Sequence, residues 1–337
     1  MDFRLVTTET GWQSLKEAWD ALLPESISPY PFLDCAYLQT WWQTRGGGEW
    51  PQESQLAIIV GEEAGTLVGI APLFFAPGQE AALRFLGQIE VSDYLDVIVR
   101  QDHLSNFLEG LLAFIASADL PTKSLDLANI ISDSPTLTAL PAACEAAGWD
   151  CECSVIQPSI YLQMAATWDD YLAGIDKKQR HEIRRKMRNA ESNYEVGFTI
   201  MGPEHDCQKE MDSFMTMMRH EPDKDAFLTE PMVTFIGDSA RIFCSQGRLH
   251  LCFLTFNQVK VAAYYSILAG KDLLVYNSAY AAEYFQASPG WVLLGKVIQW
   301  AIENGFEKVD LMRGDEVYKY RFGGIERFVH RFSCQPR

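Results

Sequence analysis

The chain has 337 residues, of which 48% are hydrophobic and 12% aromatic, a composition that excludes a disordered chain and supplies a sizeable core. Its formal net charge of −17 argues against general nucleic-acid binding. The charge is uneven, because residues 1–157 hold 6 Lys and Arg against 22 Asp and Glu, whereas residues 158–337 hold 22 against 23. An anionic ligand would therefore favour the second half.

No apolar run reaches the length of a membrane span, and the first fifteen residues lack the apolar core of a signal peptide. We therefore expect a cytoplasmic protein without a transmembrane segment. Peripheral contact with a membrane stays open.

Hydrophobic runs in the first half predict strands and helices in alternation. Glu62-Glu63-Ala64-Gly65 would form the turn of a hairpin, and Gly148 would end the last helix. The predicted elements are strands at 56–60 and 66–75, a strand at 95–100, a helix at 103–117, a strand at 123–128 and a helix at 135–147.

The second half begins with helices and continues with an antiparallel meander of three strands. Thr167 would cap a long helix that continues to about Asn193. The predicted elements are helices at 167–193, 207–220 and 231–245, strands at 249–256, 259–268 and 273–280, a helix at 290–304 and a strand at 308–312.

Both halves therefore contain strands, a helix and a further strand in the same order. This repeat predicts an α/β (α+β) fold of two tandem halves, each with a mixed, mainly antiparallel sheet flanked by helices. The joint is expected near residues 156–160, which divides the chain into residues 1–157 and 158–337.

Eight cysteines are too few for a disulfide framework in a chain of this length. Cys151 and Cys153 would share one face of a strand, and so would His250 and Cys252. Either pair could supply two metal ligands, but a zinc site needs three or four and no second pair has matching spacing. We interpret these thiols as buried structural groups and expect no metal site.

A turn between the meander and the last long helix has a pattern that suits phosphate binding. Its sequence is Gln286-Ala287-Ser288-Pro289-Gly290-Trp291. Pro289 suits the first helical position, and Gly290 allows a ligand to approach the backbone. The N–H groups of Gly290, Trp291 and Val292 would point out of the helix end and favour an anion. The alternative is an ordinary helix start without a ligand.

A second motif, residues 310–324, is dense in ionisable groups. Acids, arginines, a lysine and tyrosines stand together in it, and such mixtures are typical of sites because neighbouring charges shift pKa values. The alternative is a solvated surface turn with incidental ion pairs. The aromatic residues of this motif disfavour that alternative, because a solvated turn would leave the apolar rings of Tyr318, Tyr320 and Phe322 exposed to water.

These two motifs resemble those of the bacterial GNAT-related acetyltransferases of the CelD-like type. The segment Tyr318-Lys319-Tyr320-Arg321-Phe322-Gly323-Gly324 also resembles the end of the FemABX peptidyltransferases, where an aromatic residue and a lysine precede Phe-Gly-Gly. The resemblance covers about residues 160–325. It implies a degenerate GNAT-like half at 1–157 and a catalytic GNAT-like half at 158–337.

The resemblance implies an acyltransferase that uses acetyl-CoA or another acyl-CoA as co-substrate. In the GNAT fold, the thioester lies between two splayed strands and the pyrophosphate rests on the turn that begins the following helix. Pro289 and Gly290 stand where that turn usually carries two glycines. The implied cofactor-binding residues are Gln286, Ser288, Gly290, Trp291 and Val292.

The FemABX resemblance places Lys319 in the active site, where it would stabilise developing negative charge. Direct transfer needs a base for the proton of the attacking amine, and the candidates are Asp315, Glu316 and Tyr318. Backbone N–H groups or Lys319 would stabilise the oxyanion. No Gly-x-Ser-x-Gly elbow or Cys–His pair points to a covalent intermediate.

A basic segment, residues 177–188, holds seven Lys and Arg among twelve residues. It is either the solvated side of an amphipathic helix or a clamp for an anionic group, and attraction to a membrane surface is a third interpretation. Similar basic helices recur in the CelD-like family. We therefore expect Arg184 to contact the substrate, together with Arg313 and Tyr280.

The first half lacks a small-residue turn before its helix, and its acidity makes it a poor anion binder. It is predicted to hold the acceptor or to shape the cleft. Asp93, Tyr94 and Asp96 could face that cleft, although a strand end at the surface is the favoured alternative. We expect the side chains of Trp41, Trp42 and Trp50 to pack in the core or on the surface.

Three functions follow as hypotheses. The first is an acyl-CoA-dependent N-acyltransferase, most simply an acetyltransferase, acting on an amino sugar or another amine in polysaccharide or cell-envelope metabolism. The second is a FemABX-like aminoacyl-tRNA-dependent peptidyltransferase, which the overall acidity disfavours. The third is a non-catalytic protein that retains the fold. The expected partner is a small-molecule or saccharide acceptor, and the sequence does not indicate the oligomeric state.

Overall fold

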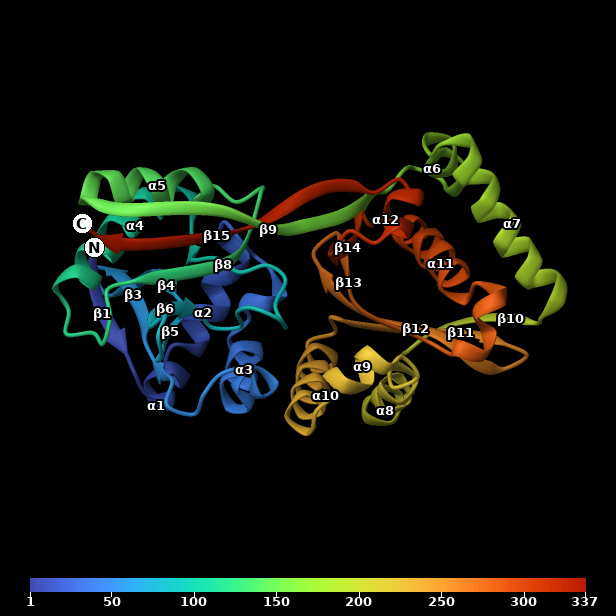
Figure 1. Ribbon diagram of the computed structural model, residues 1–337, viewed down its shortest axis with the longest axis horizontal. Coiled ribbons are helices and arrows are strands. Elements are labelled where there is room, and N and C mark those ends of the chain that lie inside the picture. Colours follow the sequence, from blue (N-terminus) through green and yellow to red (C-terminus); the bar gives the residue numbers. More distant parts are fainter. The chain divides into compact units, whose positions relative to one another are not determined.

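The computed structural model describes residues 1–337 and divides into two units (Figure 1). The first unit comprises residues 1–157 and 327–337, and the second comprises residues 158–326. The chain enters the second unit in β9 (Trp149–Gln163) and leaves it in β15 (Ile325–Pro336). The last eleven residues, which we had expected in the second half, lie in the first unit because β15 pairs with β8 (Leu125–Ile131).

The first unit contains two sheets. One is antiparallel with the order β1-β3-β4-β7, and the other has the order β9-β15-β8-β6-β5-β2 with β6 and β8 parallel. The first part of β9, up to Gln157, belongs to this unit. The strands are β1 (Asp2–Val6), β2 (Gln55–Leu56), β3 (Ile58–Glu63), β4 (Thr66–Ala71), β5 (Leu73–Ala76), β6 (Ala82–Phe85) and β7 (Ile98–Val99). The α-helices are α1 (Glu9–Gln13), α2 (Lys16–Leu22), α3 (Cys35–Gly48), α4 (Leu104–Ser117) and α5 (Thr136–Ala147).

The second unit has one sheet with the order β10-β11-β12-β13-β14-β9, in which only β13 and β14 are parallel. Its strands are β10 (Val196–Ile200), β11 (Leu249–Phe256), β12 (Val259–Ala269), β13 (Asp272–Tyr280) and β14 (Lys308–Arg313). Its α-helices are α6 (Trp168–Gly174), α7 (Lys177–Asn193), α8 (Cys207–Met218), α9 (Pro222–Phe227), α10 (Glu230–Ser245), α11 (Pro289–Glu303) and α12 (Val317–Arg321). Figure 1 shows α7 and α11 on one side of this sheet and α8, α9 and α10 on the other.

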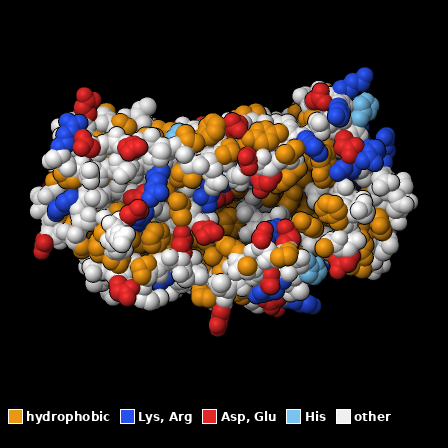
Figure 2. Space-filling model, viewed as in Figure 1, with side chains coloured by type: hydrophobic (Ala, Val, Ile, Leu, Met, Phe, Trp, Pro, Cys, Tyr) orange, Lys and Arg blue, Asp and Glu red, His pale blue; other side chains and the backbone are white.

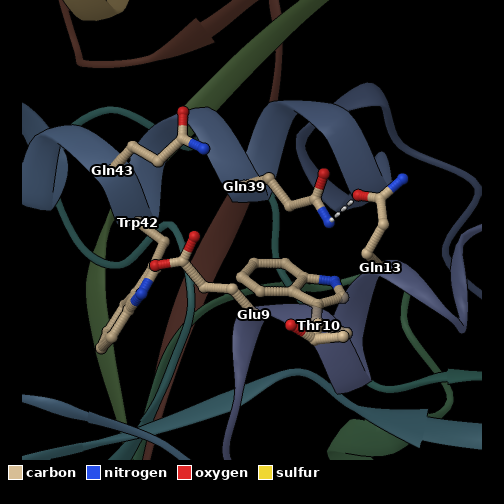
Figure 3. A pocket seen from close by; sticks show the side chains of 7 residues that line it. Glu9, Thr10, Gln13, Gln39, Trp42 and Gln43 are labelled. Carbon is tan, nitrogen blue, oxygen red and sulfur yellow. Dashed lines mark hydrogen bonds between the residues drawn. The ribbon is translucent and has the colours of Figure 1, made fainter.

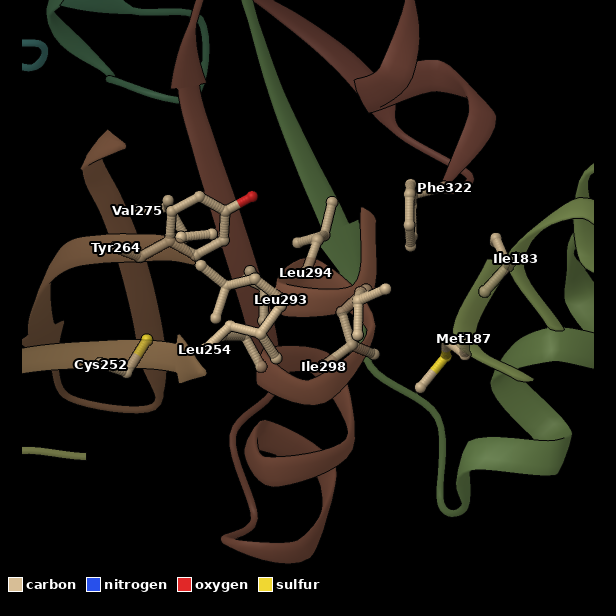
Figure 4. Close-up of a cluster of buried hydrophobic side chains, with 14 of the residues drawn as sticks. Ile183, Met187, Cys252, Leu254, Tyr264, Val275, Leu293, Leu294, Ile298 and Phe322 are labelled. Carbon is tan, nitrogen blue, oxygen red and sulfur yellow. The ribbon is translucent and has the colours of Figure 1, made fainter. Parts of the chain in front are cut away.

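The core that positions the candidate site lies between α11, α7 and the sheet (Figure 4). Leu294 and Ile298 on α11 are fully buried, and Ile183 and Met187 on α7 pack into the same cluster. Close contact between the two helices depends on Gly295, because a Cβ atom there would lie 2.8 Å from the Met187 sulfur. The apolar face of α7 is thus fixed against α11, while its basic face stays on the surface.

The predicted fold class is confirmed, since both units combine mainly antiparallel sheets with flanking helices. One helix prediction was wrong. The expected single helix from 167 to 193 is split into α6 and α7, because Ile175 is extended and the Asp176 carboxylate caps a new helix by accepting from the N–H groups of Lys178 and Gln179. None of the helices combines the length and the apolarity needed to cross a membrane.

Candidate active site

Strands β13 and β14 begin as neighbours and then separate. Their parallel pairing covers only residues 272–274 of β13, although β13 continues to Tyr280 and β14 continues to Arg313. On its other side β13 stays paired with β12, with a register shift at Tyr265 and Ser266. Such an irregularity bends a strand and increases its twist, which fits the divergence of β13 from β14.

A cavity of about 420 Å³ lies beside the diverging part of β13. Its walls come from β12, β13, the 3-10 helix at Ala282–Ala287, the first turn of α11, α12 and one lysine of α7. The volume lies within the range of small-molecule sites. Exposed Phe285 stands among the lining residues as a large apolar side chain next to solvent.

The turn before α11 forms one wall of this cavity, with Gln286, Ser288, Pro289, Gly290 and Trp291 all lining it. Ser288 has left-handed backbone angles, and its carbonyl accepts from the N–H groups of Trp291 (3.0 Å) and Val292 (3.3 Å). Of the three N–H groups predicted to point out of the helix, only that of Gly290 is left without a protein acceptor. Val292 is fully buried and does not line the cavity.

Gly290 faces open space. A Cβ atom placed on it would have no heavy atom within 4 Å, so the backbone at this point is open to a ligand. Lys186 lines the same cavity from α7, with its ammonium group 4.0 Å from the centre of the Trp291 ring. Burial lowers the pKa of Lys186 below its usual value, and the charge of nearby Glu182 offsets this fall only in part. An unpartnered N–H, the positive end of a helix dipole and an ammonium group therefore border one space.

Two phenols stand in the cavity opposite this helix end. Tyr264 on β12 and Tyr318 on α12 both line it, and Tyr264 is only 5% exposed. Figure 4 places the Tyr264 ring beside Val275 at the edge of the apolar core. Burial raises the pKa of both tyrosines, and Tyr318 adds to the rise at Tyr264. Both are therefore protonated near neutral pH, a state in which a phenol can donate a proton but not accept one as a base.

Tyr280, predicted to contact substrate, ends β13 and lines the cavity. Burial raises its pKa, and the adjacent Glu221 carboxylate raises it further through its charge and a hydrogen bond. Lys224 on α9 bonds Glu221 (2.6 Å) and the carbonyl of Ser278 (2.6 Å), which also lines the cavity. A carboxylate and an ammonium group are thereby fixed beside Tyr280.

Lys319 is 2% exposed and does not line the cavity. Its ammonium group donates to the carbonyls of Met312 (3.2 Å), Arg313 (2.7 Å) and Gly314 (3.3 Å) and pairs with Glu316 (2.9 Å). These bonds fix the turn after β14, where Met312 has a positive φ of 61°. In this arrangement Lys319 holds the backbone that leads into α12.

The other predicted residues are dispersed. Asp315 and Glu316 are exposed and lie outside the cavity lining, as does partly buried Arg313. Arg184 pairs with Asp169 (3.0 Å) on the surface. Figure 2 shows Lys and Arg side chains gathered over α7, but only Lys186 from that helix reaches the cavity.

Sequence reasoning missed Lys186, Tyr264, Glu221 and Lys224. Lys186 was one of several basic residues in its segment. Its position could have distinguished it, because it lies one helical turn after Glu182 and next to buried Met187. Tyr264 looked like an ordinary strand residue. Glu221 and Lys224 are local to α9 in sequence, and no motif marks them.

In the first unit, the residues proposed to face a cleft are buried instead. Asp96 is 1% exposed and accepts hydrogen bonds from Ser28 (2.8 Å), Thr136 (2.7 Å) and Ser134. Tyr94 is fully buried and accepts from Arg327 at 3.1 Å. The Asp96 carboxylate therefore organises the interior of the unit.

A separate hollow of about 320 Å³ in this unit is drawn in Figure 3. Glu9, Gln13, Gln39 and Gln43 line it, and Gln39 donates to Gln13 at 3.1 Å. No lysine or arginine lines it, so it has nothing to neutralise a diphosphate. Trp42 also lines it but is 5% exposed, and Trp41 is fully buried, as expected of packing residues.

Comparison with family models identifies one domain in the chain. Residues 177–320 match the family model described as acetyltransferase (GNAT) domain, which covers every residue of the cavity wall. No curated protein matches the sequence.

Similar solved structures span the whole chain. FemX has a TM-score of 0.63 at 15% identity, over 98% of this chain and 97% of its own. A conserved protein of unknown function from Bacteroides thetaiotaomicron VPI-5482 has a TM-score of 0.62 at 12% identity, over 98% and 100%. The C-terminal domain of a protein assigned as a lysylphosphatidylglycerol synthetase from Agrobacterium fabrum has a TM-score of 0.55 at 11% identity, over 95% and 92%. At these identities the likeness concerns the fold alone, which this chain shares with FemX over almost its whole length.

Proposed function

Starting from a GNAT domain within a tandem GNAT fold, we propose that this protein is an acyl-CoA-dependent N-acyltransferase. The observation that carries the proposal is a single cavity lined both by the head of α11 and by two phenols, buried Tyr264 and partly buried Tyr318. The helix head offers phosphate-binding groups, and the phenols offer proton donors. Transfer from a thioester attached to a diphosphate uses both.

The residues present fit coenzyme A at the α11 end. Gly290 leaves its N–H and the space around its Cα open, and Lys186 supplies one positive charge beside it. The lining between them and β13 is mostly apolar or aromatic, including Ala262, Leu293 and Trp291. Such a lining suits the uncharged arm between the diphosphate and the thioester sulfur.

We further propose that Tyr318 or Tyr264 donates the proton needed by the departing thiolate. In the transfer, the amine nitrogen forms a bond to the acyl carbon, the carbon–sulfur bond breaks and the sulfur takes a proton. A phenol whose pKa is raised by burial is protonated at neutral pH and can make that donation. This role replaces the proton-accepting role first considered for Tyr318.

The proton lost by the amine requires a base at the same cavity. Glu221 is proposed for this role, because its carboxylate bonds Tyr280, and Tyr280 lines the cavity. Asp315 and Glu316 are exposed, whereas Glu221 is partly buried, which makes both of them weaker candidates. Lys319 is proposed to act through the backbone it holds, as a positioning residue.

The proposed acceptor is an amine, with an amino sugar of polysaccharide or envelope metabolism as the first class to test. Glu221 and Lys224 lie together at the Tyr280 edge and are only about one-quarter exposed. A carboxylate and an ammonium group held side by side can bind a polar acceptor by its hydroxyl and amine groups. The proposal places transfer in the cytoplasm.

The second candidate is transfer from aminoacyl-tRNA, which the likeness to FemX keeps in view. The basic surface of α7 would have to bind the tRNA. Several of its cations already have acidic partners, since Arg184 pairs with Asp169 and Arg185 with Glu182. This neutralisation and the net charge of −17 favour the smaller acyl carrier.

Thermal unfolding with coenzyme A, acetyl-CoA or bulk tRNA tests the proposal, because a ligand that binds only the native state raises Tm. We expect acetyl-CoA and coenzyme A to raise Tm and tRNA to have no effect. Lys186→Gln should weaken the coenzyme A effect, whereas Lys178→Gln, an exposed change on the same helix, should not. Stabilisation by tRNA alone would refute the acyl-CoA assignment. If acetyl-CoA does raise Tm, a screen of amino sugars for release of free coenzyme A tests turnover.

A further inference from the structure

Three cysteines from different elements of the first unit converge on one point. Cys144 lies on α5, Cys151 on β9 and Cys334 on β15, and their sulfur atoms all lie within 4.8 Å of one another. The Cys334 and Cys151 sulfurs are 3.4 Å apart. No other group of three or more His, Cys, Asp or Glu side chains in the chain has such spacing.

The fold brings these residues together by two devices. Gly148, in the left-handed conformation at the end of α5, turns the chain back so that Cys151 on β9 faces Cys144 on the helix. Strand β15 lies next to β9 in the sheet and places Cys334 beside Cys151. Cys144 is fully buried, Cys334 is 1% exposed and Cys151 is partly exposed.

We propose that Cys144, Cys151 and Cys334 form a three-thiolate site for a thiophilic metal ion, with Zn²⁺ and Cu⁺ as the fitting class. Metal–sulfur bonds of about 2.3 Å place thiolates about 3.8–4.0 Å apart in tetrahedral or trigonal sites. The observed spacing brackets that value, so binding needs only small shifts of the side chains. Thiolate ligands select these soft ions over Mg²⁺ and Ca²⁺.

The surroundings favour a cation. The first unit carries 22 Asp and Glu against 9 Lys and Arg, a balance of −13. Cys334 borders a hollow of about 520 Å³ that Glu152 and Gln335 also line, which gives an ion a path from solvent. Arg84 and Arg331 line the same hollow, but both pair with Asp126. Zn²⁺ would complete its shell with water at this side, and Cu⁺ needs no fourth ligand.

The role of the ion would be to fasten the returning C-terminal strand. It would link α5, β9 and β15, and each thiol would release its proton to solvent on binding. A Cys151–Cys334 disulfide is the competing use of the same atoms. It would form by loss of two electrons to a disulfide or peroxide oxidant and would leave Cys144 idle, whereas the metal site uses all three sulfurs.

Titration of the reduced full-length protein with Cd²⁺ tests the proposal, because cadmium–thiolate charge-transfer absorption grows with the number of bound sulfurs. We expect saturation at one equivalent, displacement of bound Zn²⁺ by added Cd²⁺ and a rise in Tm with Zn²⁺. Cys151→Ser and Cys334→Ser should reduce the band by about one-third or abolish it, and should remove the Zn²⁺ effect on Tm.

Cys153→Ser is the matched control, because Cys153 lies on the same strand as Cys151, is exposed and is outside the cluster. It should bind Cd²⁺ as the unchanged protein does. The proposal is overturned if reduced protein shows no saturable band, or if Cys334→Ser binds as tightly as Cys153→Ser. Reduced protein that ignores Cd²⁺ but reoxidises to a Cys151–Cys334 disulfide would assign these sulfurs to redox chemistry instead. The outcome is independent of acyl transfer, because the cluster and the candidate cavity belong to different units.

Discussion

Replacement of Gly290 by alanine separates ligand binding from stability. A Cβ atom at this position meets no protein atom within 4 Å, so the substitution fits the folded chain without a clash. The new methyl group would instead occupy the cavity that Gly290 lines. If a diphosphate binds against this backbone, the methyl group would block its close approach.

The two effects have opposite signs. Alanine in a helical position stabilises a protein by about 0.4–1 kcal/mol relative to glycine, because the unfolded chain loses freedom. For a unit of this size that corresponds to a rise in Tm of about 2 °C. Loss of the close backbone contact should weaken coenzyme A binding by about tenfold or more, or about 1.4 kcal/mol.

Differential scanning calorimetry would measure stability, and isothermal titration with coenzyme A would measure affinity. Gly237→Ala on α10 is the matched control, since a Cβ atom there also meets nothing within 4 Å and Gly237 lies outside the cavity lining. It should raise Tm without changing affinity. Unchanged coenzyme A affinity in Gly290→Ala would refute the assignment of the α11 head as the phosphate site.

Three further predictions concern other residues. Tyr318→Phe should lower kcat about 100-fold with little change in KM, measured with acetyl-CoA and an active acceptor, and an unchanged kcat would leave Tyr264 as the proton donor. Lys319→Met should lower the free energy of unfolding by about 3 kcal/mol in urea titrations, because one buried and two partly buried carbonyls lose a charged donor, and a loss below measurement error would contradict its structural role. Burial lowers the pKa of His250 to about 4, below its unfolded value of about 6.5, so only the unfolded state takes up a proton as pH falls between these values. The free energy of unfolding should therefore drop by about 3 kcal/mol between pH 6.5 and pH 4, and it should drop less in His250→Leu. Parallel pH profiles of the two proteins would show that His250 does not cause the drop.

The sequence predicted the elements whose signals are local. The meander at 249–280 and the helix after Pro289 are close to their predicted bounds, because alternation and Pro–Gly signals depend only on near neighbours. The break at Ile175 was missed although two local signals flank it: Gly174 is a residue that ends helices, and Asp176 is an N-cap at the start of the polar run.

The site was harder to predict than the fold. The turn at Ser288 lines the cavity, whereas the Lys319 ammonium group donates to three backbone carbonyls, an arrangement that no sequence pattern reveals. Tyr264 and Lys186 come to the cavity from elements far apart in the chain. The same holds for Cys334, which meets Cys144 and Cys151 only because β15 returns to the first unit.

That return has a consequence for biosynthesis. Residues 158–326 leave the ribosome before residues 327–337, yet the latter supply the strand that pairs with β8. Domains generally fold in the order of their synthesis, but here the unit made first waits for its last strand until the later unit has emerged. Until then β8 keeps one edge without its partner. Ribosome-bound chains that lack residues 327–337 should therefore bind chaperones more readily than chains in which these residues have emerged from the ribosome.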